Sequence, residues 1–467
     1  MTDGERRHPE LLAIVVAAVL LRLPIALSRS PLTYDDGVYL ASAGALRAGD
    51  LPFRDVFSSQ GPAFLPLLWV ADALGLRTLW SPRLLPLLAG VVLVVVVHRL
   101  ARRLGDRWGA ALAALVVATS GCVMFTTDRI ESDAVTAAVA AVAVLVASGA
   151  PSRRRYVATT VLLGVALAVK SLFAGPAVLA ALWLVGRRGG WRTALVVGAG
   201  AIATVVALAL PWGLAGVWDQ YVHLHLLGRA DADTSGNGRL AREVLRSYDR
   251  VLEWLGLAAL LAVVWRWVAR RPSLPRTERD LAVAVWIWFG AALLVVPIHA
   301  PLFLQHLTML IPPATLLVAR YRPPLVAVVA VLVLALPGQA ERVGWRRTSP
   351  PPTQQERSAI ELLRTIEPRS AKVISDEPAL PWLAGRTSPG SMVDLSFVRI
   401  DAGDLTTADV VVAANHADVC AVLLWSNRLA QLPGLRRALH EYEPVFRDGD
   451  HELLLREGCD VRPATAP

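Results

Sequence analysis

The sequence predicts an all-α polytopic membrane protein of about eleven membrane-spanning helices, followed by a small C-terminal α/β domain. Two observations indicate this fold class. The chain has 467 residues, of which 55% are hydrophobic and only 18% are charged, whereas an ordinary soluble protein has about 25% charged residues. The apolar residues also lie in long blocks, such as 11–27 and 193–211, which approach the roughly 20 residues needed to cross a bilayer.

The first apolar block, residues 11–27, is interpreted as a membrane span. A signal peptide has a shorter apolar region and ends in a cleavage site of small residues. The block is too long for such a region and is poorly supplied with small residues where cleavage would occur. We therefore expect it to remain in the protein as the first helix.

The net charge of +9 comes largely from arginines in short loops between the apolar blocks. Clusters of this kind mark cytoplasmic loops, because Lys and Arg are retained on that side of the membrane. The charge therefore indicates membrane topology, and we expect no nucleic-acid partner. The clusters lie at residues 99–107, 153–155, 187–192, 270–279 and 320–322.

Placing every arginine cluster in the cytoplasm predicts eleven spans. The N-terminus is then cytoplasmic, and the odd number of spans places the C-terminal tail outside the cytoplasm. Residues 61–76 are also apolar, but they are short for a span and contain Pro62 and Pro66, so we expect a helix in the outer interface. The spans are 11–27, 82–98, 108–125, 134–149, 156–171, 174–186, 193–211, 252–269, 281–297, 302–319 and 323–338.

The sequence predicts two domains, a transmembrane domain over residues 1–340 and an extracytoplasmic α/β domain over 341–467. The Pro-rich run Ser349–Pro352 is typical of a linker. After it come a helix-like run at 355–366 and strand-like runs at 372–375, 410–414, 421–425 and 451–455, a mixture that indicates a small α/β domain. Cys420 and Cys459 could form a disulfide if this domain lies outside the cytoplasm.

Acidic side chains gather in two of the three predicted outer loops, which are 29–81, 126–133 and 213–250. Thr33–Tyr39, here named the first acidic motif, follows the first span, and Thr127–Asp133, the second acidic motif, precedes another. A carboxylate at the membrane surface can take a proton from an acceptor hydroxyl within hydrogen-bond reach. The alternative is a structural one, in which Asp35, Asp36 and Asp133 only cap the helices that follow them.

Five segments resemble the GT-C membrane glycosyltransferases, and within them the protein O-mannosyltransferases (family 39) and the lipid A aminoarabinose transferases. Tyr34–Ala41, Gly49–Asp55 and Gln60–Pro62 resemble the first outer loop of these enzymes, with its Asp-Asp/Glu-x-x-Tyr motif and Pro-containing interfacial helix. Arg129–Asp133 resembles their second acidic motif. Lys170–Pro176 stands where related chains often have Lys-Gly-Pro.

The resemblance implies transfer of a sugar from a polyprenyl-phosphate donor to an acceptor, with inversion at the anomeric carbon. Carried over by position, Asp35 is the general base and Asp36 its neighbour in the motif. Asp133 is the second acid, which positions the acceptor or supports the base. The leaving group is a phosphate, so a fixed cation near it would stabilise the charge that develops.

Two departures from the family pattern concern that cation. The aminoarabinose transferases have Arg at the position of Val38 and Lys just before the Pro of the third segment, where this chain has Gln60-Gly61-Pro62. Because this chain lacks both cations, an aminoarabinose donor is doubtful. The donor phosphate would then be bound by Lys170, Arg54 or Arg129. For Lys170 the alternative is a lysine that extends from a helix end to the interface.

The remaining candidate substrate-binding residues are Tyr39, Gln60, Arg129 and Glu131 of the motifs, together with His306. His306 could contact the donor phosphate or serve as a packing histidine. No metal ligands are expected, because the alternating His223 and His225 have no third ligand at a recognisable spacing. A requirement for a divalent metal stays open.

The sequence thus predicts an inverting glycosyltransferase of the cell membrane that moves a hexosyl or pentosyl group to a cell-envelope glycan, lipid or protein acceptor. Two alternatives stay open. A transporter or flippase of a lipid-linked intermediate should carry ionisable residues near the middle of its spans, whereas here the acids gather at one face. A non-catalytic scaffold with the same fold is the second alternative, because it would explain why the two cations of the family pattern are missing.

Overall fold

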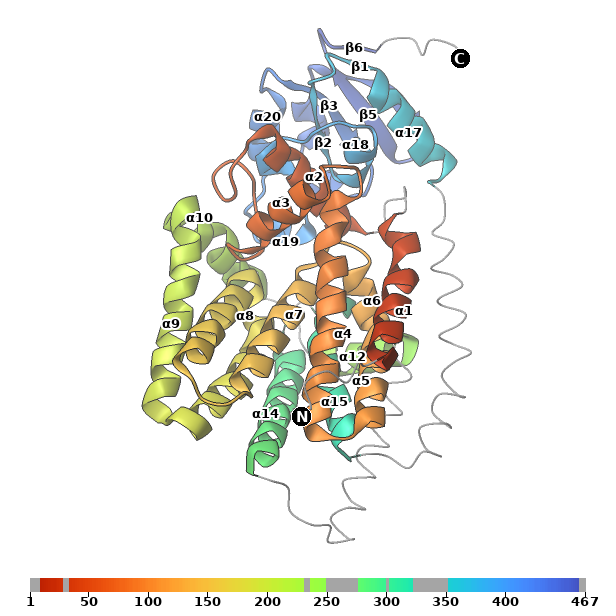
Figure 1. The fold of residues 1–467 in the computed structure, drawn as a ribbon. Helices are drawn as coiled ribbons and strands as arrows, with labels where there is room; N and C mark the ends of the chain where they lie inside the picture. The colour runs from red at the N-terminus through yellow and green to blue at the C-terminus, as the bar shows by residue number, and fades with distance from the viewer. Residues whose placement is uncertain are drawn as a thin grey trace. The chain divides into compact units, whose positions relative to one another are not determined.

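The computed structural model describes residues 9–27, 33–230, 236–248, 276–299, 302–321 and 352–461, and Figure 1 shows its fold. The described chain is mostly helical. It divides into two compact units, each made of three stretches of sequence. Unit 1 consists of Met1–Ala26, Leu85–Leu208 and Asp233–Thr348, and unit 2 consists of Leu27–Leu84, Ala209–Ala232 and Ser349–Pro467.

Unit 1 is a bundle of apolar helices. Five helices of the described chain are long and apolar enough to cross a membrane, or six if the bent pair α5 and α6 counts as one span. This establishes a multi-pass membrane protein. The described helices of unit 1, including shorter ones and the mostly polar α12, are α1 (Pro9–Ala26), α4 (Leu84–Leu104), α5 (Arg107–Thr119), α6 (Gly121–Thr127), α7 (Ser132–Ala147), α8 (Arg153–Gly189), α9 (Trp191–Ala209), α12 (Asn237–Tyr248), α14 (Arg276–Ile298) and α15 (Ile311–Tyr321), with the 3₁₀ helix η4 (Leu304–Leu310).

Helix α8 contains a reversal of the chain. Lys170 has non-helical backbone angles (φ −156°, ψ 95°) inside this 37-residue helix. A Cβ placed on Gly189, at the end of the helix, would come 2.6 Å from the Tyr156 hydroxyl near its start. The two ends therefore lie side by side, and α8 is two arms joined at Lys170. The two arms correspond to the predicted spans 156–171 and 174–186. The reversal at Lys170 corresponds to the turn expected between these spans.

Three other predicted spans differ from the structure or lie outside it. Residues 302–319 do not form one long helix, because η4 is followed by an α-helix of only 11 residues. Pro312 and Pro313 explain the change, since proline fits the first turn of an α-helix but breaks a helix that reaches it from before. The predicted spans 252–269 and 323–338 lie outside the described residues.

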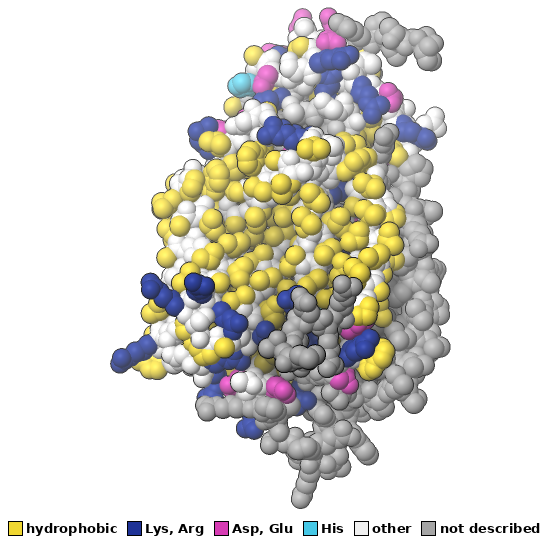
Figure 2. Space-filling model, in the orientation of Figure 1, with side chains coloured by type: hydrophobic (Ala, Val, Ile, Leu, Met, Phe, Trp, Pro, Cys, Tyr) yellow, Lys and Arg dark blue, Asp and Glu magenta, His cyan; other side chains and the backbone are white. Residues whose placement is uncertain are grey.

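The surface of unit 1 has the polarity of a protein embedded in lipid. Figure 2 shows a broad apolar band over these helices, with Lys and Arg side chains at the edge where α8 ends and α9 begins. Exposed apolar side chains include Leu195, Val196 and Ile202 of α9. Such residues are stable against lipid tails, whereas charged side chains belong at the membrane boundary.

Unit 2 begins with the segment predicted as the first outer loop. It contains α2 (Tyr34–Ala48), α3 (Phe64–Leu74) and the 3₁₀ helix η1 (Ser81–Arg83). With 11 residues, α3 is about 16 Å long, roughly half the thickness of a hydrocarbon core. It is held to α2 by Arg47, whose guanidinium donates to both carboxylate oxygens of Asp72 at 2.8 and 2.7 Å.

Residues 352–461 complete unit 2 with helices and a mixed sheet. The four-stranded sheet has the order β2-β3-β5-β4, in which only the β2–β3 pair is parallel, and β1 pairs with β6. The elements are α17 (Gln354–Thr365), β1 (Ile366–Glu367), β2 (Lys372–Ser375), α18 (Ala379–Leu383), α19 (Phe397–Asp401), α20 (Thr407–Ala414), β3 (Val419–Leu424), α21 (Leu435–Ala438), β4 (Tyr442–Asp448), β5 (His451–Arg456) and β6 (Asp460–Val461).

The central strands are buried on both faces. Val422 packs in a core with Val410 of α20, whereas its neighbour Leu423 packs in a second core with Leu363 of α17. Cys420 and Cys459 form a disulfide, which the sequence had left as a possibility. The predicted boundary at residue 340/341 falls outside the described residues and stays a prediction.

Candidate active site

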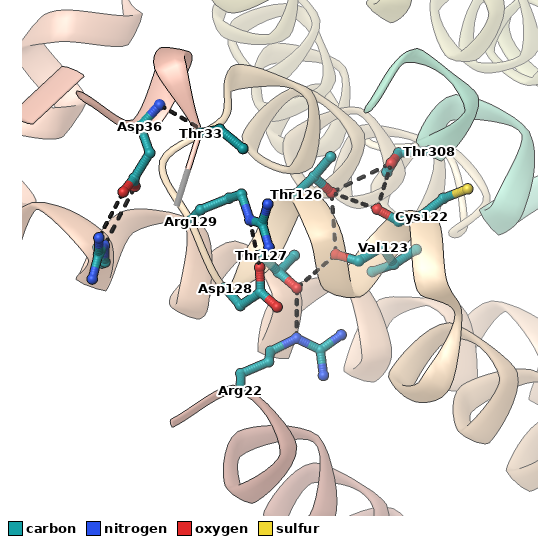
Figure 3. Close-up of polar contacts among 11 residues, drawn as sticks. Arg22, Thr33, Asp36, Cys122, Val123, Thr126, Thr127, Asp128, Arg129 and Thr308 are labelled. Atoms are coloured by element: carbon teal, nitrogen blue, oxygen red, sulfur yellow. Dashed lines mark hydrogen bonds and ion pairs between the residues drawn. The ribbon is translucent and has the colours of Figure 1, made fainter. Parts of the chain in front are cut away.

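The first acidic motif forms the first turn of α2. Thr33 is the N-cap, and its hydroxyl accepts a hydrogen bond from the Asp36 backbone N–H at 3.1 Å (Figure 3). The helix therefore begins at Tyr34, before both aspartates. The structural alternative, in which Asp35 or Asp36 caps a helix that follows them, required a later start. Because Thr33 already satisfies this end of the helix, neither Asp35 nor Asp36 is needed as its cap.

Asp36 forms a buried ion pair with Arg83 of η1. The Arg83 Nη2 atom lies 2.6 Å from Asp36 Oδ2, and Nε lies 3.3 Å from Oδ1. The side chains of Asp36 and Arg83 are 0% and 3% exposed. Both carboxylate oxygens therefore contact Arg83 inside the protein, and Asp36 connects the first turn of α2 to η1. Arg83 was missed in the sequence.

The other candidates of this loop differ in their surroundings. Asp35 is half-buried and is thus the more accessible acid of the pair. The Tyr39 ring is buried and packs edge-on against Phe64 at 4.9 Å. Gln60 lies in the loop before α3, where its backbone N–H donates to Ser58 at 3.3 Å. Arg54 is exposed and pairs with the adjacent Asp55 at 2.8 Å.

The second acidic motif leads into α7 of unit 1. Glu131 occupies the N-cap position without a side-chain capping bond, and Asp133 lies in the first turn. Both are buried, at 3% and 4% exposure. Asp133 therefore does not cap this helix, and another reason is needed for burying its carboxylate.

Lys170 supplies the partner of Asp133. Its Nζ atom lies 2.8 Å from Asp133 Oδ2 and 4.6 Å from the centre of the Phe173 ring. The reversal within α8 brings the lysine to this position. The second oxygen, Oδ1, is buried and has no hydrogen-bond partner among the described residues. A buried oxygen of this kind is costly unless a donor reaches it.

A small pocket adjoins this ion pair. It is lined by Asp133 and Phe173 together with apolar and small residues of the surrounding helices, which are Thr136, Ala137, Ala140, Ala177, Trp288 and Met309. The His306 ring packs against Phe173 at 4.7 Å and against His299 at 4.4 Å. His306 thus packs on the same Phe173 ring as the Lys170 ammonium. Its Nδ1 accepts a hydrogen bond from the Phe303 backbone N–H at 3.1 Å.

The broken helix pair α5–α6 carries the start of the second acidic motif. The two helices meet at a 57° bend, after which Asp128 pairs with Arg129 at 3.2 Å, and Arg129 stacks on Phe125 at 4.1 Å. Arg22 of α1 connects both sides of the bend. It donates to the Ala118 carbonyl at 2.9 Å. It also donates to the Thr127 hydroxyl at 2.5 Å (Figure 3).

Arg22 is fully buried, and an arginine within a membrane span is rare enough to suggest a function. We expect Arg22→Met to lower the free energy of unfolding by several kcal/mol, because each buried acceptor that loses its donor costs about 1–3 kcal/mol. Thermal unfolding in detergent measures this. The control is Arg107→Met, since Arg107 is 55% exposed and its contact with Glu10 is 3.5 Å long. Equal stability of both variants would contradict the role.

The described residues contain no group of three or more His, Cys, Asp and Glu side chains that could hold a metal ion. His223 ends the π-helix η3 (Trp218–His223), and His225 lies in α11 (Leu224–Ala230), where its Nδ1 is 2.7 Å from the Tyr221 carbonyl.

Part of the sequence and the overall fold are similar to those of known membrane glycosyltransferases. Residues 59–213 match the family model described as dolichyl-phosphate-mannose-protein mannosyltransferase. The matched range contains Gln60, the second acidic motif and Lys170, and it begins after the first acidic motif. No protein of curated function matches the sequence.

Solved structures confirm the fold that the resemblance predicted. ArnT from Cupriavidus metallidurans bound to undecaprenyl phosphate superposes with a TM-score of 0.63 at 16% identity, covering 95% of this chain and 97% of ArnT. The Archaeoglobus fulgidus oligosaccharyltransferase in complex with Zn and sulfate gives 0.55 at 14% identity, covering 93% and 71%. Arabinofuranosyltransferase AftD from Mycobacteria gives 0.53 at 16% identity, covering 97% and 42%.

Proposed function

We propose that the protein is an inverting glycosyltransferase that moves a hexosyl or pentosyl group from a polyprenyl-phosphate donor to a cell-envelope glycan, lipid or protein. The GT-C fold supports this class of enzyme. The undecaprenyl phosphate in the ArnT structure and the dolichol phosphate in a structure of archaeal oligosaccharyltransferase AglB support a lipid-phosphate donor. We further propose that the reaction takes place on the outer face, with the N-terminus in the cytoplasm.

The observation that carries the proposal is the buried carboxylate of Asp133. Lys170 holds one of its oxygens, and the other is buried without a hydrogen-bond partner among the described residues. The Asp133 side chain also lines the pocket. A sugar or acceptor hydroxyl would supply the missing hydrogen bond, since buried polar atoms are nearly always paired. Measurement of sugar transfer tests this assignment.

In the proposed step, Asp35 takes the proton of the acceptor hydroxyl while its oxygen attacks the anomeric carbon. The bond between this carbon and the phosphate oxygen breaks, and its electron pair leaves with the polyprenyl phosphate. Asp133 orients the acceptor, and the Lys170 ammonium stabilises the negative charge that develops on the phosphate. The resemblance of both motifs, and not a measured distance, assigns Asp35 and Asp133 to one reaction.

The proposed location of the C-terminal segment outside the cytoplasm agrees with its chemistry. Disulfides persist in oxidising compartments and are rare in the cytosol, and the Cys420–Cys459 disulfide joins β3 to the loop before β6. The arginine clusters that predicted the topology support the same orientation.

The test uses purified protein in nanodiscs with radiolabelled polyprenyl-phosphate hexoses and pentoses and an extract of cell-envelope acceptors. We expect label to move from one donor to one acceptor class. Label that moves across the bilayer without transfer would favour a flippase. Neither transport nor release from any donor would favour a scaffold, and both results would overturn the proposal.

The two lysines of the chain, Lys170 and Lys372, provide a matched pair of variants for the same assay. We expect Lys170→Met to lower kcat by about 10²–10³-fold, the usual effect of removing one group that stabilises charge in the transition state. Lys372→Met should retain the wild-type rate, because Lys372 pairs with Asp418 in a half-exposed position. Equal rates in both variants would exclude Lys170 from the reaction.

A further inference from the structure

The first acidic motif is packed against the C-terminal segment, residues 349–467, within unit 2. Tyr34 stands immediately before Asp35 in the first turn of α2. Its hydroxyl donates to Asp394 Oδ1 at 3.1 Å and accepts the Leu395 backbone N–H at 2.6 Å. Both partners lie more than 350 positions further along the chain, and Asp394 is itself buried.

A second contact holds the ring of Tyr34. The guanidinium carbon of Arg428 lies 3.7 Å from the centre of this ring and 5.0 Å from that of Phe397 in α19. Stacking of this kind combines cation–π attraction with the fit of two flat groups. Arg428 is fixed in turn by hydrogen bonds to the Ser426 hydroxyl at 2.6 Å and the Asp376 carbonyl at 3.3 Å.

The backbone of α2 also approaches the C-terminal segment closely. A Cβ on Gly37 would come within 2.8 Å of the Ala379 nitrogen, at the start of α18, so glycine is required for this approach. Figure 1 shows α2 beside α18. Further along α2, Arg47 stacks on the Trp382 ring at 4.7 Å. The helix that carries Asp35 and Asp36 is therefore fixed over most of its length.

The chemistry of Tyr34 suits a permanent contact. Burial, and after it the charge of Asp394, raises the pKa of Tyr34 well above its usual value of 10.0. The phenol therefore stays protonated at physiological pH and can always donate to the Asp394 carboxylate. Tyr34 has no need to titrate or to touch a substrate in order to act.

We infer that Tyr34 and Arg428 are positioning residues, through which the C-terminal segment sets the orientation of the first turn of α2 and so of Asp35. This inference rests on the proposed function, in which Asp35 is the base. A base displaced by about 1 Å can lower a rate by as much as 100-fold. The C-terminal segment thus contributes to catalysis without touching the reacting atoms.

The test compares tyrosine-to-phenylalanine variants at two positions of unit 2, the half-buried Tyr34 and the buried Tyr442. Tyr34→Phe keeps the ring on Arg428 but removes both hydroxyl bonds. Tyr442→Phe is the matched control, because its hydroxyl donates to the Ala414 carbonyl at 2.7 Å in the core of the C-terminal segment. We expect Tyr34→Phe to lower kcat about tenfold with KM for the donor nearly unchanged, and Tyr442→Phe to keep the wild-type kcat.

A variant at Arg428 and an activity-independent measurement complete the experiment. Arg428→Met, which removes the stacked guanidinium, should lower kcat by more than Tyr34→Phe does. The intact protein becomes lighter when Cys420 and Cys459 lose their thiol hydrogens and form the disulfide. The mass of every variant therefore reports whether the C-terminal segment has folded correctly. Hydrogen exchange of the backbone amides of residues 35–40 should become several-fold faster in Tyr34→Phe and not in Tyr442→Phe.

These measurements separate the inference from the proposed function. If the wild type transfers sugar while Tyr34→Phe changes neither kcat nor exchange, the positioning role is wrong. Equal losses of kcat in Tyr34→Phe and Tyr442→Phe would assign the effect to general destabilisation and would also overturn it. If the wild type transfers no sugar but exchange at residues 35–40 responds as expected, Tyr34 holds the motif and the proposed reaction is wrong.

Discussion

Replacing Asp35 with asparagine is expected to abolish sugar transfer while the protein still folds. The amide has nearly the size of the carboxylate but cannot take the proton of an acceptor hydroxyl, and loss of a general base costs about 10²–10⁴-fold in rate. Asp35 is half-buried, so the loss of one charge should have little effect on folding. The measurement is the initial rate of label transfer, together with the melting temperature of the same preparation.

Asp50→Asn is the matched control for this variant. Asp50 directly follows the C-cap of α2, in the same loop as Asp35, and is half-buried as well. We expect it to retain the wild-type rate. A fully active Asp35→Asn variant would remove Asp35 as the base. Asp36→Asn is less informative, because it leaves Arg83 buried without its carboxylate and so changes stability and activity together.

The largest expected effect on stability follows from Arg83→Met. Removing one member of a buried ion pair leaves the other charge uncompensated, which costs about 3–5 kcal/mol. Asp36 is 0% exposed, so it cannot recover its lost interaction from water. Thermal unfolding in detergent should therefore show a much lower midpoint, with unit 2 opening first in limited proteolysis.

Two further variants test the cause of this loss. Arg54→Met removes an arginine from an ion pair of the same loop, but Arg54 is 66% exposed and its partner Asp55 35%, so the cost should stay below about 1 kcal/mol. The double variant Arg83→Met with Asp36→Leu should regain much of the stability, since it leaves no buried charge. A double variant as unstable as Arg83→Met would show that packing, and not charge, causes the loss.

The sequence was sufficient to predict the parts of the site that are local. The first acidic motif was recognisable because its residues are consecutive, and the turn at Lys170 because it interrupts an apolar block. The pairing of Lys170 with Asp133 was not predictable, since it depends on how α7 packs against the two arms of α8. From the sequence, Lys170 is predicted to be either a phosphate contact or an interfacial lysine.

The buried contacts of Arg83 and Arg22 were not predicted, because they join residues that are far apart in the sequence. Arg83 is separated from Asp36 by 47 positions and stands where a predicted span begins, so it was indistinguishable from an arginine at a membrane boundary. Arg22 did give a signal, because it interrupts the apolar block 11–27. A charged residue within an apolar block is a candidate for a buried contact.

In the C-terminal segment, strands were predicted where both faces are apolar, as in β2, β3 and β5. Residues 410–414 were predicted as a strand from their valines but belong to the helix α20, because Thr406 and Asp409 form a capping box that starts a helix. Strand β4 was not predicted, because it is a largely exposed edge strand in which apolar and charged side chains do not alternate regularly.

The packing of α2 on α18 also has a consequence for biosynthesis. Asp35 leaves the ribosome early, whereas Asp394 and Arg428, which hold its neighbour Tyr34, are made more than 350 residues later. At about 5–20 residues per second, the nascent chain waits roughly 20 seconds or longer before that contact can form. A chain terminated before residue 394 would thus contain every acid of both motifs and still lack the means to hold the first of them in place.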